Sequence, residues 1–475
     1  MTATLTREVR SPRVEPARDR ACRSGIGWFV AAIVLVVSVW GVSLTAVHLR
    51  AMDDTGLVSV LPWTALAALG LLVVSFGLAL SRPQAPSWLL ALHVGVLVVL
   101  LYATPPLLEG TLRYSWAWKH VGIVDYIDRT GGVDPDIETL GVYHNWPGFF
   151  AFNAWLTRAA GFDSALSYAT WATPFFNLLT VAGVAGVLRA LTNDRSVIAL
   201  GSWIFVLANW IGQGYFAPQA VSFLWYLVVL AILLRWFPGS SLPDGDRPLA
   251  CPPAQRAGLM AVVLLLLLGI VSTHPLTPIV TVLVLGALAA LRQTSARTLP
   301  LITAALTAYW LLFVAAPFTG KSLAEALGVL GDVGGNLDGT LLAYGQASSG
   351  QVLVSLMSRA LTGLVLLLAV LGGLRCLRRG PRDPRPIVLA AVPFGILAIS
   401  PYGHEVLFRA YLFALPGLVF YAARLLLPRH TARDGRLNAG IVVGVSGVLL
   451  VGFLFAQFGN ERQYYFTRPE VAAAE

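Results

Sequence analysis

Long apolar runs separated by short polar segments fill most of the chain between residues 26 and 458. An α-helix rises about 1.5 Å per residue, so about 20 apolar residues cross a hydrocarbon core of about 30 Å. The runs lack the alternation of apolar and polar positions that is typical of barrel strands. The pattern predicts an all-α polytopic membrane protein with about 13 transmembrane helices. The predicted spans are 26–47, 57–80, 87–104, 165–188, 196–211, 218–234, 257–271, 276–291, 298–318, 352–374, 387–400, 406–427 and 439–458.

Four consecutive runs, 196–211, 218–234, 257–271 and 276–291, are short. They are joined in pairs by the segments GQGYFAPQ and STHPLTP, whose prolines and glycines end helices. A run of about 16 residues extends only about 24 Å as a helix, which is less than the thickness of the hydrocarbon core. We therefore expect the outer ends of these helices to lie below the membrane surface and to leave a hollow there.

The outer loop, residues 105–164, is the longest polar interval between the apolar runs. Two of its segments, 114–126 and 146–159, can form amphipathic helices rich in Trp, Tyr and Phe. Such helices lie in the membrane interface with their rings at headgroup depth, so we expect them to roof the hollow. The loop also concentrates acids, histidines and tryptophans: Glu109, Asp125, Asp128, Asp134, Asp136, Glu138, His120, His144, Trp116, Trp118 and Trp146.

Composition and charge agree with a membrane protein. The 475 residues are 57% hydrophobic and 12% charged, with a mean hydropathy of +0.73, outside the range of soluble globular proteins. The net charge of +9 is concentrated in loops on the amino-terminal side of the spans, which predicts a cytoplasmic amino terminus and an outer carboxyl terminus. Basicity thus indicates topology and no nucleic-acid partner. We divide the chain into a disordered cytoplasmic tail (1–25), a transmembrane domain with its outer loop (26–458) and an outer carboxyl-terminal segment (459–475).

Ionisable groups at the edge of a membrane are candidates for function because their burial is costly. Glu109 follows the third run directly, and partial desolvation there would raise the pKa of its carboxyl group toward that of a general base. Asp125 and Asp128, on the first loop helix, are second candidates. The structural alternatives are an i, i+4 pair of Glu109 with Arg113, and a solvated helix face for the two aspartates.

Four cations could hold an anionic group of a substrate. Arg359 lies seven residues into an apolar run, where a charge needs a partner, and an arginine fork suits a lipid phosphate. Arg409 follows Glu405 at i+4, so these two could instead pair with each other. The candidates for binding a donor phosphate are Arg409, Arg359, Lys119 and Arg113.

Polar groups beside aromatic rings suit the binding of sugars, although anchoring in the interface would explain the same aromatics. The candidates for substrate binding are His120, His144, Asn145, Trp146, Tyr215, Gln219, His404 and Glu405. His120, His144, His274 and His404 could also join acids around a divalent metal such as Mg or Mn, or simply cap helix ends. No local metal motif such as HExxH is present, and no metal-binding residues are assigned.

The segments RYSWAWKHVGIVDYI, YHNWPGFF, QGYFAPQA and GHEVLFRAYLF, together with the large outer loop, resemble bacterial members of the GT-C superfamily of polytopic membrane glycosyltransferases. The excess of arginine over lysine fits a GC-rich genome such as that of an actinobacterium. The resemblance implies a polyprenyl-phosphate-linked sugar as donor, a loop carboxylate as base, best matched by Glu109, and an arginine or lysine on the donor phosphate. Two features depart from the family pattern. Glu109 is followed by glycine instead of a second acid, and the loop follows the third run instead of the first.

From residues and resemblance together we expect a multi-pass enzyme of the cell membrane with an outward-facing active site. It would transfer a sugar, with inversion, from a polyprenyl-phosphate donor to a glycan or lipid-linked acceptor of the cell envelope. A lipid or solute transporter or flippase is one alternative, although ionisable groups near the midplane and an internal repeat would then be expected. A catalytically inactive GT-C-like scaffold is the other, suggested by the missing acidic pair.

Overall fold

The computed structural model describes residues 17–240, 252–320, 347–379, 383–399, 405–427 and 435–474. This part of the chain is helical and holds no β-strand beyond two isolated bridges. Every predicted apolar run contains a helix. The helices of the runs are α1 (Ala17–Leu44), α2 (Trp63–Leu80), α3 (Ser87–Tyr102), α9 (Ala172–Leu191), α10 (Arg195–Ala208), α11 (Pro218–Trp236), α12 (Pro253–Thr273), α13 (Leu276–Ala290), α14 (Leu299–Tyr309), α17 (Ser349–Arg379), α18 (Arg385–Ala391), α19 (Val406–Leu426) and α20 (Gly435–Phe458).

Eight of the described helices are long and apolar enough to cross a membrane, and five more apolar helices have 10–17 residues. The protein is therefore a helical membrane protein. That the five shorter helices also cross, and which end faces the cytoplasm, stay predictions. The predicted tail is only partly described, and α1 already begins within it at Ala17. The segment between the predicted spans 298–318 and 352–374 falls largely on residues 321–346, outside the described residues.

The lengths of several runs were predicted wrongly. α11 has 19 residues and α12 has 21, so these two are long enough to cross, whereas α10 and α13 are short as expected. The physical reason is that polar residues such as Arg235 and Arg256 continue the helix beyond the apolar run. In the run 57–80 the α-helix begins only at Trp63, after Pro62, because proline suits the start of a helix.

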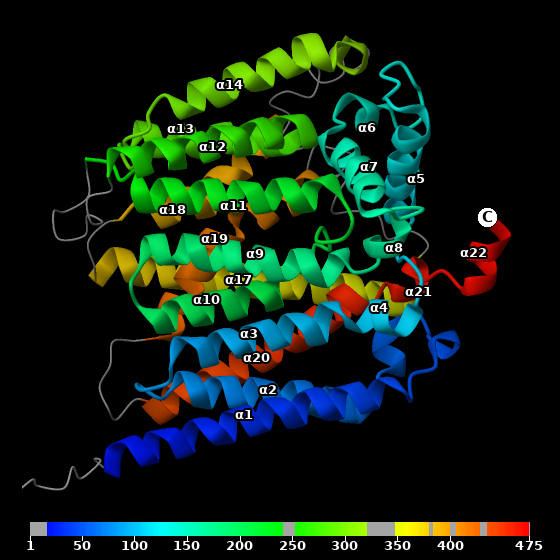
Figure 1. Cartoon of the computed structure of the whole chain (residues 1–475). Helices are drawn as coiled ribbons and strands as arrows, with labels where there is room; N and C mark the ends of the chain where they lie inside the picture. The colour runs from blue at the N-terminus through cyan, green and yellow to red at the C-terminus, as the bar shows by residue number, and fades with distance from the viewer. Residues whose placement is uncertain are drawn as a thin grey trace, which may run out of the picture.

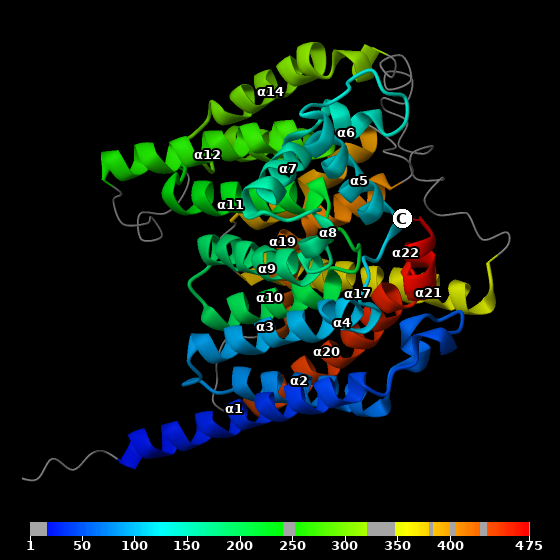
Figure 2. The ribbon, with the colours of Figure 1, turned by 45° about the vertical axis from the view of Figure 1, so that its right-hand side comes forward.

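The outer loop folds into four short helices that stand across one end of the bundle. They are α5 (Ser115–Thr130), α6 (Gly141–Asn145), α7 (Gly148–Ala160) and α8 (Leu166–Ala169), so both predicted amphipathic helices are present within a few residues. Figure 1 places them at the right-hand end of the bundle, with the start of α1 at the opposite end. The same end holds α4 (Thr104–Glu109), α21 (Glu461–Tyr464) and α22 (Arg468–Ala474), as the turned view in Figure 2 also shows.

The centre of the bundle is α19, whose most apolar window is 83% buried, against 28% for α1, α12 and α17. A helix that is apolar on all sides is suited to such a position, while the outer helices expose apolar side chains to lipid. α19 packs against α17, and Gly372 of α17 lies directly against the backbone of Tyr421. Absence of a side chain at Gly372 is what permits this close approach.

Replacing Gly372 with alanine is expected to destabilise the protein by about 1–3 kcal/mol, because the new methyl group would overlap the carbonyl oxygen of Tyr421. Gly373→Ala is the matched control, since its methyl group would lie 3.9 Å from the nearest atoms of the Tyr421 ring. Thermal unfolding in detergent measures both. A lower midpoint for Gly373→Ala than for Gly372→Ala would contradict the packing described here.

Candidate active site

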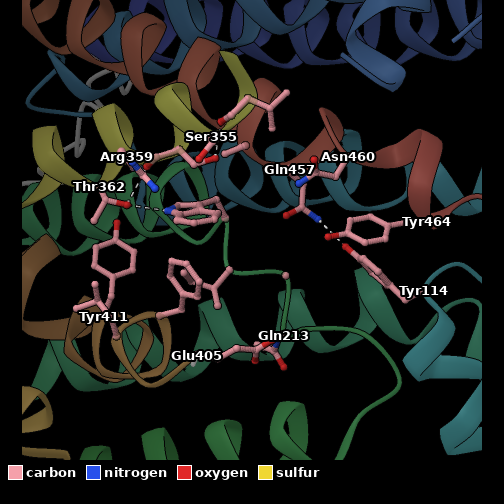
Figure 3. A pocket seen from close by; sticks show the side chains of 18 of the residues that line it. Tyr114, Gln213, Ser355, Arg359, Thr362, Glu405, Tyr411, Gln457, Asn460 and Tyr464 are labelled. Carbon is pink, nitrogen blue, oxygen red and sulfur yellow. Dashed lines mark hydrogen bonds between the residues drawn. The ribbon is translucent and has the colours of Figure 1, made fainter. Parts of the chain in front are cut away.

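A cavity of about 810 Å³ lies beside the outer loop, where segments from five parts of the chain meet. Its walls come from the start of α5, the α10–α11 connection, α17, the start of α19, and the end of α20 with α21 (Figure 3). The cavity reaches the connection GQGYFAPQ, whereas no residue of the second connection, STHPLTP, which is also described, lines it. The expected depth of the helix ends below the membrane surface stays a prediction. The polar side chains that line it are Tyr114, Ser115, Gln213, Tyr215, Gln351, Ser355, Ser358, Arg359, Thr362, Glu405, Tyr411, Gln457, Asn460 and Tyr464.

Arg359 and Glu405 are the charged residues among the described side chains that line the cavity. Arg359 comes from α17, beside Ser355 and Thr362, and Glu405 comes from the start of α19 near Gln213 (Figure 3). They stand on different walls, so a molecule in the cavity can meet a cation on one side and a carboxylate on the other. This division suits a substrate with an anionic group at one end and a proton to lose at the other.

Glu405 is held by Arg409, one helical turn further along α19, as the sequence spacing allowed. The side chain of Glu405 is 52% exposed and that of Arg409 only 8%. Arg409 therefore lies behind the cavity wall and orients the carboxylate that faces the cavity. The predicted contact of Arg409 with a donor phosphate would require Arg409 to be exposed to the cavity, and Glu405 lies in front of it.

His120 of α5 is buried behind the same wall. Its Nδ1 lies 2.8 Å from the carbonyl oxygen of Phe216, and its ring stacks on Tyr215 with 5.7 Å between centroids and 3° between planes. A carbonyl oxygen can only accept, so Nδ1 carries the proton. Burial lowers the pKa of His120 to about 4, and Nε2 is left as an acceptor that no described donor reaches.

His274, at the outer end of α12, lies close enough to His120 and Arg409 for their charges to act on it. Burial, followed by the charge of Arg409, lowers the pKa of His274 to about 3. Its Nδ1 accepts from the backbone N–H of Thr277 at 3.3 Å. The structure thus gathers the predicted residues His120, Tyr215 and Arg409 together with His274, which the sequence had offered only as a possible metal ligand or helix cap.

Acidification is expected to destabilise the protein through these two histidines. The unfolded chain takes up their protons near its pKa of about 6.5, well before the folded protein does. Stability is therefore complete above about pH 6.5 and declines toward about pH 4, by at most on the order of 3 kcal/mol for His120. Thermal unfolding over this range should show a shallower decline for His120→Gln, while the exposed His48→Gln should match the wild type. Equal slopes in all three proteins would contradict it.

Glu109 ends α4 and does not line the cavity. Its side chain is buried, and neither carboxyl oxygen meets a hydrogen-bond partner among the described residues. Behind it, Arg113 forms a two-pronged ion pair with Glu461 of α21, with 2.8 Å from Nε to Oε1. Burial and the charge of Glu461 raise the pKa of Glu109, and Arg113 opposes this only in part. The anticipated pair of Glu109 with Arg113 is thus replaced by a cluster that includes Glu461.

Asp125 and Asp128 face the neighbouring loop helices instead of the cavity. Asp125 accepts a hydrogen bond of 3.1 Å from the hydroxyl of Ser164, and burial raises the pKa of its carboxyl group. Asp128 pairs with the exposed Arg158 of α7 at 2.9 Å. Both contacts tie α5 to the following loop segments. Lys119 of the same helix is exposed, with its ammonium group 4.0 Å from the ring centroid of Trp116, and Trp116 does line the cavity.

The remaining predicted residues build the loop around α6. His144 accepts from the backbone N–H of Asp134 at 3.0 Å, and Asn145 donates to two backbone carbonyls at 2.9 Å. Trp146 packs its ring edge-on against Phe318. Gln219 is buried in the first turn of α11, and its Nε2 meets no described acceptor. His404 lies outside the described residues.

Within the described part of the chain, no three His, Cys, Asp or Glu side chains gather in an arrangement that could hold a metal ion. His120 and His274 approach each other near Arg409, whereas His144 is used in the loop. The described segments therefore assign no ligands to the possible Mg or Mn.

The comparisons with known proteins concern the fold. No protein-family model matches the chain, and no curated protein matches it in sequence. Two solved structures of the oligosaccharyltransferase AglB from Archaeoglobus fulgidus resemble it. One, tethered with an acceptor peptide containing the NVT sequon, has a TM-score of 0.50 at 12% identity over 82% of this chain and 57% of the other. The other, in complex with an inhibitory peptide and a dolichol-phosphate, has a TM-score of 0.50 at 11% identity over 80% and 56%.

At this level of identity the likeness shows only a fold shared with part of the archaeal oligosaccharyltransferase structures. This chain spans somewhat more than half of the length of the archaeal enzyme. The shared fold supports the expected GT-C resemblance, and membership of that superfamily stays a prediction. The bacterial origin, the donor and the roles of single residues are not addressed by the comparison.

Proposed function

We propose that this protein is a membrane glycosyltransferase that moves a sugar from a polyprenyl-phosphate carrier to a glycan or lipid-linked acceptor at the outer face of the cell membrane. The observation that carries the proposal is the cavity of about 810 Å³ beside the outer loop, with Arg359 and Glu405 on different walls. It is supported by the fold shared with the archaeal oligosaccharyltransferase, and by the dolichol-phosphate in one structure of that enzyme.

Arg359 is assigned to the donor phosphate. A guanidinium offers several N–H groups in one plane and remains charged, which suits the oxygens of a phosphate. The hydroxyl groups of Ser355 and Thr362 lie on the same wall, and that of Thr362 donates to the carbonyl oxygen of Ser358 at 2.9 Å. As the bond from the anomeric carbon to the phosphate oxygen breaks, negative charge grows on the phosphate, and Arg359 stabilises that charge.

Glu405 is assigned the role of general base in place of the predicted Glu109. It lines the cavity and is half exposed, whereas Glu109 is buried behind the wall. The acceptor hydroxyl gives its proton to Glu405, and its oxygen forms the new bond to the anomeric carbon. The bond to the phosphate breaks at the same carbon, and its electron pair leaves with the polyprenyl phosphate. Attack opposite to the leaving group inverts the anomeric centre.

Binding of undecaprenyl phosphate to the full chain in detergent tests the proposal without knowledge of the sugar. Native mass spectrometry should show at least about tenfold stronger retention of undecaprenyl phosphate than of undecaprenol, because a charge-assisted hydrogen bond contributes about 1.5–3 kcal/mol. Transfer from a panel of radiolabelled undecaprenyl-phosphate sugars to cell-envelope acceptors in liposomes follows as the functional assay. Equal retention of the two lipids would refute a phosphate-directed site.

A further inference from the structure

The segment after the last span docks onto the beginning of the outer loop. The backbone N–H of Tyr114 donates to the carbonyl oxygen of Tyr464 at 3.1 Å, and the hydroxyl of Thr111 donates to that of Phe466 at 2.8 Å. The ion pair of Arg113 with Glu461 joins the same two segments and is almost fully buried. Residues separated by 348 positions are thus joined by a buried charge pair at the edge of the cavity.

This junction shapes one wall of the cavity. The rings of Tyr114 and Tyr464 lie side by side there, with 4.5 Å between centroids, and both line the cavity (Figure 3). Tyr114 has a φ of +67°, a backbone conformation that costs a bulky residue about 1–3 kcal/mol. Surrounding contacts must hold it, and the guanidinium of Arg113 lies over its ring at 4.2 Å. Loss of the junction would therefore release this wall.

The net charge of the junction depends on whether the carboxyl group of Glu109 is protonated. With Glu109, Glu461 and Arg113 all ionised, the buried group would carry one uncompensated negative charge. Tyr114 and Tyr464 add only hydroxyl groups. Of the other charged groups on the docked segment, Arg468 packs its guanidinium against Gly110, and Arg462 pairs with Asp54 at 3.6 Å near the surface. Among the described residues, neither Arg468 nor Arg462 donates a hydrogen bond to the carboxyl group of Glu109.

We propose that Glu109, Arg113 and Glu461 are positioning residues that act as a proton-dependent clamp, closing the outer loop onto the carboxyl-terminal segment when Glu109 is protonated. The effect of this clamp on substrate binding rests on the proposed function of the protein. Because burial and Glu461 raise the pKa of Glu109, the clamp is fully stable at low pH and is weakened as the pH rises through that folded-state pKa. The second carboxylate charge then repels Glu461 and competes for Arg113.

Hydrogen exchange of the backbone tests the clamp directly, after correction for the intrinsic effect of pH on exchange. As the pH is raised from acid to alkaline and Glu109 loses its proton, exchange in 110–118 and 459–468 should rise at least about tenfold in the wild type. Glu109→Gln keeps the shape of the protonated acid and should stay protected throughout. Asp54→Asn, which removes the surface pair of the same segment, should retain the wild-type step.

Two results would overturn the proposal: exchange in the wild type that does not change with pH, or a Glu109→Gln variant that is open at every pH. Retention of undecaprenyl phosphate, measured on the same samples, separates the two proposals. A pH step in exchange without any phosphate-selective binding would leave the clamp standing and refute the function. Selective binding without the step would do the reverse.

Discussion

Replacing Glu405 with glutamine is expected to lower the turnover number for sugar transfer by about 10²–10⁴-fold while retention of undecaprenyl phosphate changes little. Loss of a general base lowers turnover by a factor in this range. Glutamine is similar in size to glutamate but cannot take up the proton. Loss of turnover with little change in KM is the result that separates proton transfer from binding. Turnover with a labelled undecaprenyl-phosphate sugar in liposomes is the measurement.

Three variants serve as comparisons for Glu405→Gln. Glu405→Asp keeps a carboxylate and should retain partial turnover. Arg409→Gln removes the partner of Glu405 and tests how much of the effect comes from the broken ion pair. Asp128→Asn, in a loop contact outside the cavity, should be as active as the wild type. If Glu109→Gln abolished turnover at every pH while Glu405→Gln did not, the base would be Glu109 and the assignment made here would be wrong.

Replacing Arg359 with alanine is expected to weaken retention of undecaprenyl phosphate by about 10–100-fold and to remove the preference over undecaprenol. The estimate follows from the 1.5–3 kcal/mol of a charge-assisted hydrogen bond. Turnover should fall as well, because the same group stabilises the leaving phosphate. Arg359→Lys keeps the charge but loses the planar fork, so it should restore binding only in part.

Arg378→Ala is the matched control for Arg359→Ala, since Arg378 lies exposed near the other end of the same helix. It should bind both lipids as the wild type does. Thermal unfolding of each variant shows whether the fold is retained. Unchanged phosphate selectivity in a folded Arg359→Ala protein would move the phosphate site away from this wall of the cavity.

The positions of the helices could be predicted because they depend on local composition. A helix buried in lipid must satisfy its backbone polar groups internally and present apolar side chains. The local sequence is therefore enough to locate each span. The ends were harder to predict. α11 and α12 continue through Arg235 and Arg256 because polar side chains outside the hydrocarbon core do not stop a helix.

The candidate site was only partly predictable. His120, Tyr215 and Gln219 could be proposed from polar residues beside aromatic ones. In the structure Tyr215 lines the cavity, His120 stacks on Tyr215, and Gln219 is buried. Glu109 could be proposed from its place at the end of an apolar run. The sequence could not show whether Glu109 faces a cavity, because that depends on the rotation of α4 and on what packs against this helix. Glu461 was missed, although it lies in a polar segment just after the last span.

The sequence by itself determined a helical membrane protein, the location of its helices and the gathering of ionisable residues at one end, since hydropathy and helical length act locally. Tertiary structure alone decided which carboxylate opens to the cavity. Arg113 meets a partner 348 positions away, and Glu405 reaches the cavity through the central helix α19. Such contacts follow from how helices rotate and pack against one another, which no local pattern of apolar and polar residues records.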